Sequence, residues 1–161
     1  MSLQPQASYV VPEDTARVAR AAFPKGNTYL RMHDELGRLS ADRDFAALFP
    51  THGQPALAPA QLALVTLMQF AEGLSDRQAA DAVRARIDWK YALCLALDDP
   101  GFDYSVLCEF RARLLAKERE SLLFDALPTR CREAGLLRAA ADRFHRGAGG
   151  HPHAHPAGTG G

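Results

Sequence analysis

The segment from Leu62 to Arg113 constrains the fold more than any other part of the chain, because residues that begin and end helices recur along it. A helix is predicted from Pro59, where proline suits the first turn, to the residue before Gly73, which suits the left-handed position after a helix. Its side chains are apolar almost all round. A helix without a polar face lies in the middle of a bundle, so this segment predicts a helical core.

The next helix should begin at Ser75, because Ser75 and Gln78 have the spacing of a capping box. One face is predicted to point inward, formed by Ala79, Ala80, Val83 and Ile87. The other face then stays outside, with Asp76, Arg77, Asp81 and Arg84.

Two more helices are predicted before residue 120. Asp88 can cap the first, and the sequence Asp98-Asp99-Pro100-Gly101 should end it in a turn. Its inward residues would be Trp89, Leu93 and Leu97, and the same reasoning assigns Trp89 and Tyr91 to the core rather than to base stacking. Asp103 or Ser105 can cap the second helix, whose apolar residues recur at helical spacing: Leu107, Phe110 and Leu114.

The flanking regions contain weaker helical patterns. A short helix is predicted from Pro12 to Pro24, with Val18, Ala21 and Ala22 at helical spacing, and another over Asp42–Phe49. A last helical stretch, 123–134, should kink or break at Pro128. We therefore expect an N-terminal helical lead-in over 1–52, a helical domain over 53–138 and a disordered tail rich in Gly, Ala, Pro and His over 139–161.

Composition fits one folded domain and excludes several classes of protein. The chain has 161 residues, of which 47% are hydrophobic, and no strand pattern is present, so the predicted fold class is all-α, a compact helical bundle. Nineteen basic and nineteen acidic residues cancel, so DNA contact would have to come from a local patch. Neither a signal peptide nor a membrane span is visible, and we expect a cytoplasmic protein.

No motif for catalysis or for a cofactor is present. The chain has no Walker loop, no HExxH and no nucleophile elbow, and Asp98 and Asp99 are assigned to a turn rather than to a metal site. The three cysteines, Cys94, Cys108 and Cys131, lack CxxC spacing and are predicted to be buried thiols. The three closely spaced histidines of the tail, at 151, 153 and 155, are treated as incidental, so no cofactor, metal or small-molecule substrate is expected.

Four ordered motifs resemble one family. They are Gly73-Leu74-Ser75-Asp76-Arg77-Gln78-Ala79-Ala80, Ile87-Asp88-Trp89-Lys90-Tyr91, Asp99-Pro100-Gly101-Phe102-Asp103 and Phe110-Arg111. Together they resemble the N-terminal domain of InsH-type bacterial insertion-sequence transposases, over roughly two thirds of the chain. The resemblance implies binding to the terminal repeats of a transposon and help in assembling the active complex.

A helix–turn–helix portion with basic residues on its open face can hold DNA phosphates. The candidate DNA-binding residues form two clusters: Ser75, Arg77, Arg84, Arg86 and Lys90 in the first, and Ser105, Arg111, Arg113 and Lys117, beside Arg119, in the second. The alternative is that these are solvated helix faces, because the eight basic residues between Asp76 and Arg119 are matched by eight acidic ones.

The resembling transposases continue into a nuclease domain whose first catalytic aspartate lies in a Thr-Asp-Ser-Thr segment. This chain instead has Ala140-Ala141-Asp142-Arg143-Phe144-His145. These residues can be encoded by codons that, in another reading frame, give Gln-Gln-Thr-Asp-Ser. We therefore expect a truncated or frameshifted transposase that recognises DNA but does not cut or join strands by itself. The alternative function is a helical module that dimerises or modulates an intact transposase, or an inert remnant of a decayed element.

Overall fold

The computed structural model describes residues 10–36 and 58–119, with the isolated positions 121, 125 and 129. Every regular element within these residues is a helix, which confirms the all-α fold class. The helices are α1 (Glu13–Ala22), α2 (Thr28–Leu36), α3 (Pro59–Glu72), α4 (Asp76–Ala85), α5 (Ile87–Ala92) and α6 (Ser105–Ala116). The helix predicted over 42–49, the break at Pro128, the tail and the domain boundaries at 52 and 138 lie outside the described residues.

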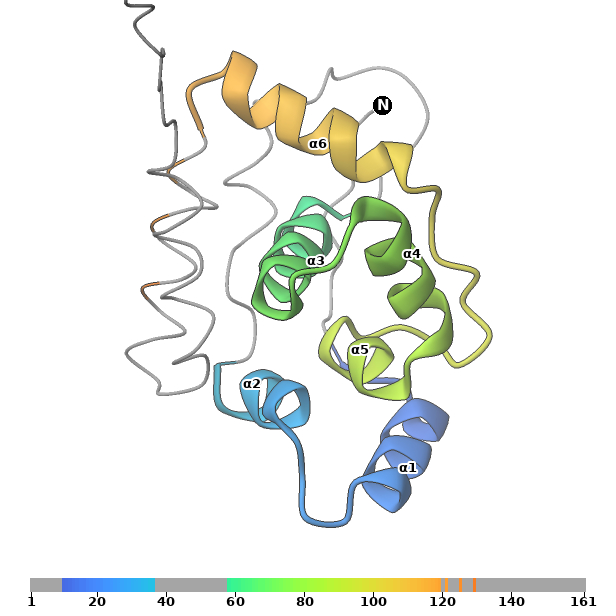
Figure 1. The fold of residues 1–161 in the computed structure, drawn as a ribbon. Coiled ribbons are helices and arrows are strands. Elements are labelled where there is room, and N and C mark those ends of the chain that lie inside the picture. The colour runs from blue at the N-terminus through green and yellow to red at the C-terminus, as the bar shows by residue number, and fades with distance from the viewer. Residues whose placement is uncertain (1–9, 37–57, 120, 122–124, 126–128, 130–161) are drawn as a thin grey trace, which may run out of the picture.

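Helix α3 is central to the fold, as its sequence predicts. It packs against α4 and α6, and α6 crosses over both (Figure 1). Nine of its residues are buried, and Gly73 ends it with φ 68° and ψ 35°, the left-handed conformation that glycine adopts without strain. The main core gathers around α3 and includes Leu62, Val65 and Met68.

Helix α4 begins with the predicted capping box. The Gln78 backbone N–H donates to Ser75 Oγ at 3.3 Å, and the Ser75 N–H donates to Gln78 Oε1 at 2.9 Å. The inward stripe of Ala79, Ala80 and Val83 is confirmed, but Ile87 is not its continuation. Arg86 adopts an extended conformation, with φ −94° and ψ 125°, which ends α4 and lets Ile87 begin α5.

Helix α5 is shorter than predicted and begins two residues earlier, at Ile87. Asp88 is its second helical residue and does not cap it, because the preceding Arg86 holds the cap position. Trp89, Tyr91 and Leu93 are buried, as predicted for this segment. Leu97 is 38% exposed rather than inward-facing, because the helix ends at Ala92 and helical spacing no longer applies.

Helix α6 buries the three predicted residues, Leu107, Phe110 and Leu114. Of the two candidate caps, Asp103 accepts a hydrogen bond from the Ser105 N–H at 2.9 Å, whereas Tyr104 holds the formal cap position.

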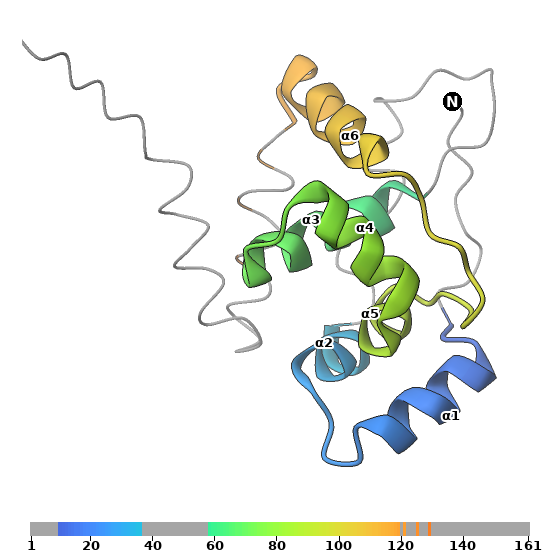
Figure 2. The ribbon, with the colours of Figure 1, turned by 45° about the vertical axis from the view of Figure 1, so that its right-hand side comes forward.

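Helices α1 and α2 pack against α5 at the other end of the molecule (Figure 2). The buried residues of α1 are Thr15 and Ala19, and the predicted Ala21 and Ala22 are exposed. Thr15 can be buried because its hydroxyl donates to the Leu95 carbonyl at 2.8 Å.

Helix α2 was not predicted, although Asn27 is a capping signal. The Asn27 side-chain oxygen accepts hydrogen bonds from the backbone N–H groups of Tyr29 and Leu30, at 3.0 and 2.9 Å. Tyr29, Leu30 and Met32 are buried.

Two further expectations can be compared with the structure. Cys108 is exposed rather than buried, although its Sγ donates to Asp76 Oδ2 of α4 at 2.9 Å, and Cys94 is half-buried. Cys131 lies outside the described residues. None of the helices in the described ranges is long and apolar enough to cross a membrane.

Candidate nucleic-acid interface

The exposed face of α4 carries Arg77, Asp81 and Arg84. Arg77 extends toward the loop before α6, where its Nη2 donates to the Tyr104 hydroxyl at 2.9 Å. Its guanidinium also lies over the Tyr104 ring, with the carbon 4.0 Å from the ring centroid. Both contacts are with a neutral side chain, so they orient Arg77 without cancelling its charge.

Arg84 lies two helical turns further along the same face. Its Nη1 is 3.2 Å from Asp81 Oδ1, and its Nε donates to the Pro100 carbonyl at 3.2 Å. The arginine and aspartate side chains are 54% and 71% exposed, and an ion pair in that setting stabilises a fold by less than about 1 kcal/mol. Because this ion pair is weak, Arg84 can exchange the aspartate for another hydrogen-bond acceptor.

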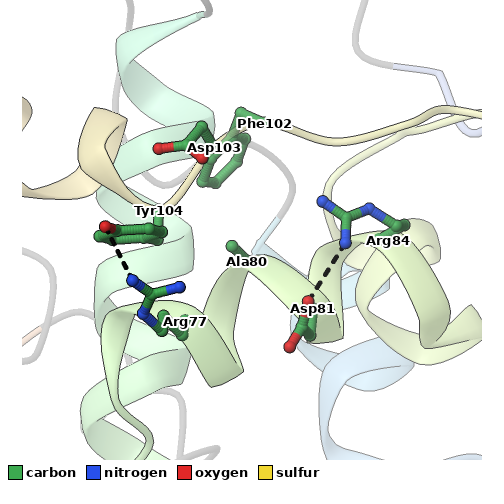
Figure 3. A pocket seen from close by; sticks show the side chains of 7 residues that line it. All are labelled: Arg77, Ala80, Asp81, Arg84, Phe102, Asp103 and Tyr104. Atoms are coloured by element: carbon green, nitrogen blue, oxygen red, sulfur yellow. Dashed lines mark hydrogen bonds and ion pairs between the residues drawn. The ribbon is translucent and has the colours of Figure 1, made fainter.

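A pocket of about 230 Å³ lies between these arginines (Figure 3). Its lining comes from α4 and from the loop before α6: Arg77, Ala80, Asp81, Arg84, Phe102, Asp103 and Tyr104. Hydrogen bonds from Ser105 lower the pKa of Asp103, and the positive charges of Arg77 and Arg84 lower it further. The pocket thus combines two cationic and two anionic side chains with two aromatic rings.

Lys90 is buried and binds the backbone of the loop between α5 and α6, which lines this pocket. Only 3% of the residue is exposed, and its Nζ donates to the Asp99 carbonyl at 2.7 Å. Burial lowers its pKa, against the opposing effect of Asp99 and Asp98. Gly101, with φ 69°, then lets the loop run close against Val83 of α4.

Arg86 points to the opposite side of α4 from Arg84. It binds Glu72 Oε2 at 2.6 Å and Asp88 Oδ2 at 2.7 Å, and its guanidinium lies 5.7 Å from the Tyr29 ring and 5.3 Å from the Trp89 ring. These contacts join α2, α3 and α5. The arginine stabilises the fold here and is not part of the exposed face that carries Arg77.

Arg111 joins α6 to α4. Its Nη2 is 2.6 Å from Asp76 Oδ2, and the two side chains are only 24% and 20% exposed. Burial raises the pKa of Asp76, but hydrogen bonds from Arg111, Cys108 and Gln69 outweigh that effect and lower the pKa to about 2. Asp76 therefore faces α6, and the prediction that it lies on the outer face of α4 is wrong.

The other candidate residues are more scattered. The Ser75 hydroxyl is engaged in the capping box, and Ser105 is exposed at the first turn of α6. Arg113 is half-buried on α6, and Lys117 is exposed just after that helix. The structure thus brings Arg77 and Arg84 to one pocket and places the α6 residues apart from them.

Sequence analysis missed the loop residues Phe102, Asp103 and Tyr104 as part of this site. Phe102 and Asp103 belong to a motif that resembles the transposase family, but the motif was interpreted only as a turn and a cap. Among the residues that the structure describes, no group of three His, Cys, Asp or Glu side chains could hold a metal ion.

A protein-family model described as "Transposase domain (DUF772)" matches residues 17–113, which run from within α1 to within α6 and make up more than half of the chain. The chain belongs to this transposase domain family. The resemblance found in the sequence is therefore confirmed at the level of the family, while the InsH type remains a prediction. No curated protein and no solved structure matches the chain.

Proposed function

We propose that this transposase domain binds DNA at the terminal repeats of an insertion sequence, through the exposed face of α4. The observation that carries the proposal is the pair of exposed arginines on that face, with Arg77 held by the neutral Tyr104 and Arg84 held by a solvated aspartate and the Pro100 carbonyl. In this role the domain recognises DNA, and the cutting and joining of strands belongs to the nuclease domain of the resembling transposases.

The arrangement of α3 and α4 supports a helix–turn–helix function. The two helices are joined by the short segment 73–75, which contains a glycine; the first is mostly buried, and the second has one buried and one exposed face. In proteins of that kind, residues near the beginning of the second helix contact DNA. Arg77 is the second residue of α4 and occupies such a position.

Binding should depend on a local patch, because the chain carries no net charge. Each cation that neutralises a phosphate releases counterions, so affinity falls as salt rises, with a slope of about 0.9 per contact on logarithmic axes. Loss of one contact should weaken binding and reduce that slope by about one.

The test uses the purified full chain and a labelled duplex that carries the terminal repeat of the element, compared with a scrambled duplex at two salt concentrations. We expect a preference for the repeat that weakens with salt. Arg77→Ala and Arg84→Ala should each weaken binding several-fold. Equal or absent binding to both duplexes would contradict the proposal.

Arg17→Ala is the matched control for Arg84→Ala. Arg17 is 3.2 Å from Asp14 on α1, three residues earlier in the helix, just as Arg84 is 3.2 Å from Asp81. Both arginines are exposed, so the two variants remove the same charge and the same kind of ion pair. Equal losses from both variants would show non-specific electrostatics rather than a site on α4.

The ion pairs favour a second candidate function, a helical module that associates with itself or with an intact transposase. Arg84 and Arg111 both contact aspartates within the chain, which reduces the positive charge available to DNA. Sedimentation at rising protein concentration distinguishes the two functions. Association without duplex binding would support the interaction module.

A further inference from the structure

The charge balance of the α4 pocket does not suit a phosphate. Arg77 and Arg84 contribute two positive charges, while Asp81 and Asp103 contribute two negative ones. A phosphate inside would gain from the guanidinium groups but would be repelled by the carboxylates. The ligand that fits such a pocket is neutral and offers hydrogen-bond donors as well as acceptors.

The aromatic residues that line the pocket favour a ligand with a flat ring. Phe102 and Tyr104 form part of the wall, and Ala80, which is only 4% exposed, leaves space between the charged side chains (Figure 3). The volume of about 230 Å³ is below the range of about 300–1,000 Å³ typical of sites for drug-sized ligands, so it suits one small ring system. Unpaired bases bind proteins by this combination of stacking and edge hydrogen bonds.

The hydrogen-bonding groups match guanine better than the other bases. Guanine O6 and N7 accept from an arginine, and its N1–H and N2–H₂ groups can donate to a carboxylate. Arg84 occupies only Oδ1 of Asp81 among the contacts seen here, and Arg77 uses one Nη for Tyr104. Each guanidinium has five N–H donors, so further donors remain on both.

The pocket is held in shape before any ligand arrives. Lys90 and Arg84 bind consecutive carbonyls of the loop, those of Asp99 and Pro100, at 2.7 and 3.2 Å. The Asp103 carboxylate accepts from the Ser105 N–H, which orients the end of the loop. A loop fixed in this way does not have to be ordered on binding, which favours affinity.

We propose that the pocket between Arg77 and Arg84 binds a single unpaired nucleobase, guanine in preference to the others. The inference rests on the proposed function and extends it, because a base inside a duplex cannot reach the pocket and must be unstacked first. The domain would then contact DNA through the arginines and recognise a place where one base is extruded from the helix.

The test compares three short labelled duplexes bound by the full chain: one fully paired, one with a single unpaired guanine, and one with an abasic linker at the same position. The abasic duplex has the same flexible backbone but no base. We expect the unpaired guanine to bind about tenfold more tightly than the other two, because only a base can stack on the aromatic wall; tenfold corresponds to about 1.4 kcal/mol. An unpaired thymine should bind less tightly than the guanine.

Asp81→Asn separates base recognition from attraction to phosphates. Removing a negative charge should strengthen binding to the paired duplex, yet it should abolish the advantage of the unpaired guanine. Asp14→Asn removes the equivalent carboxylate of the matched ion pair on α1 and should preserve that advantage. Both aspartates are more than two thirds exposed, so both variants should fold.

The outcomes distinguish this inference from the proposed function. Equal binding to the guanine and abasic duplexes, or an advantage that Asp81→Asn retains, would overturn the base pocket while leaving duplex recognition intact. Binding to the unpaired guanine without preference for the terminal repeat would support the pocket and contradict the proposed function. No binding to any duplex would overturn both.

Discussion

At the scale of single residues, the partner of an arginine decides what it does. Arg84 and Arg86 are two positions apart, yet one faces solvent and the other binds Glu72 and Asp88 beside two aromatic rings. Burial raises the pKa of Glu72, but the hydrogen bonds from Arg86 and Tyr29 outweigh it and lower the pKa. The planar guanidinium suits this site because it can bind two carboxylates and lie against rings at once.

Arg86→Lys should therefore lower the free energy of unfolding by about 1–3 kcal/mol, since an ammonium group cannot make the same set of hydrogen bonds. Urea denaturation at neutral pH measures the change. Arg84→Lys is the control, and it should change stability by less than about 0.5 kcal/mol because its site is on the surface. Equal effects of the two substitutions would contradict the structural role given to Arg86.

Asp76 should make stability depend on pH. Its pKa is about 2 in the folded chain, against an ordinary value of 3.8, so its contribution is complete above 3.8 and is lost as the pH falls toward 2. We expect Asp76→Asn to cost about 1–3 kcal/mol at neutral pH and progressively less below about pH 4. Urea denaturation of both proteins across this range measures it; a constant difference would contradict the role of the carboxylate, and the exposed Asp81→Asn should show little difference at any pH.

At the scale of helices, the elements that sequence predicted well are those whose ends depend on local chemistry. Pro59, Gly73 and the Ser75 capping box define α3 and α4 through contacts within a few residues. The short α5 was harder to predict, because the extended Arg86 that begins it is fixed by Glu72, a residue of another helix. Helix α2 had a readable cap in Asn27, and its signal was overlooked.

The residues of the candidate site were also predicted well only where their positions depend on local sequence. Helical spacing correctly placed Arg77 and Arg84 on the outside of α4, because that choice depends only on the helix itself. The burial of Lys90 and the inward position of Asp76 depend on the loop before α6 and on Arg111. Residue spacing in a single sequence does not predict contacts between segments that are far apart along the chain.

Ser75→Ala tests whether the capping box stabilises the beginning of α4. Removing a capping hydroxyl typically costs about 1 kcal/mol, because a backbone N–H at the beginning of the helix loses its partner. Thermal or urea denaturation should show this loss. Ser105→Ala at the beginning of α6 should cost less, since the Ser105 hydroxyl does not cap that helix; a larger loss there would contradict the assignment of the two serines.

At the scale of the whole molecule, the described helices form a structural region at one end and the candidate binding surface at the other. Around α5, the contacts with α1 and α2 are structural and involve buried polar groups such as Thr15 and Tyr91. Around α4, the loop before α6 and the exposed arginines form a surface with a pocket. Because the net charge is zero, any attraction to DNA has to come from a local patch, and we propose that this surface supplies it.

The most direct test of that claim is amide chemical-shift mapping of the ¹⁵N-labelled full chain as a terminal-repeat duplex is added. We predict that the shifts concentrate on the exposed face of α4, around Arg77 and Arg84, and on residues 102–104, while those of α1 stay small. Shifts that concentrate on α1 and α2 instead, or an absence of shifts at concentrations where the duplex is bound, would contradict the account.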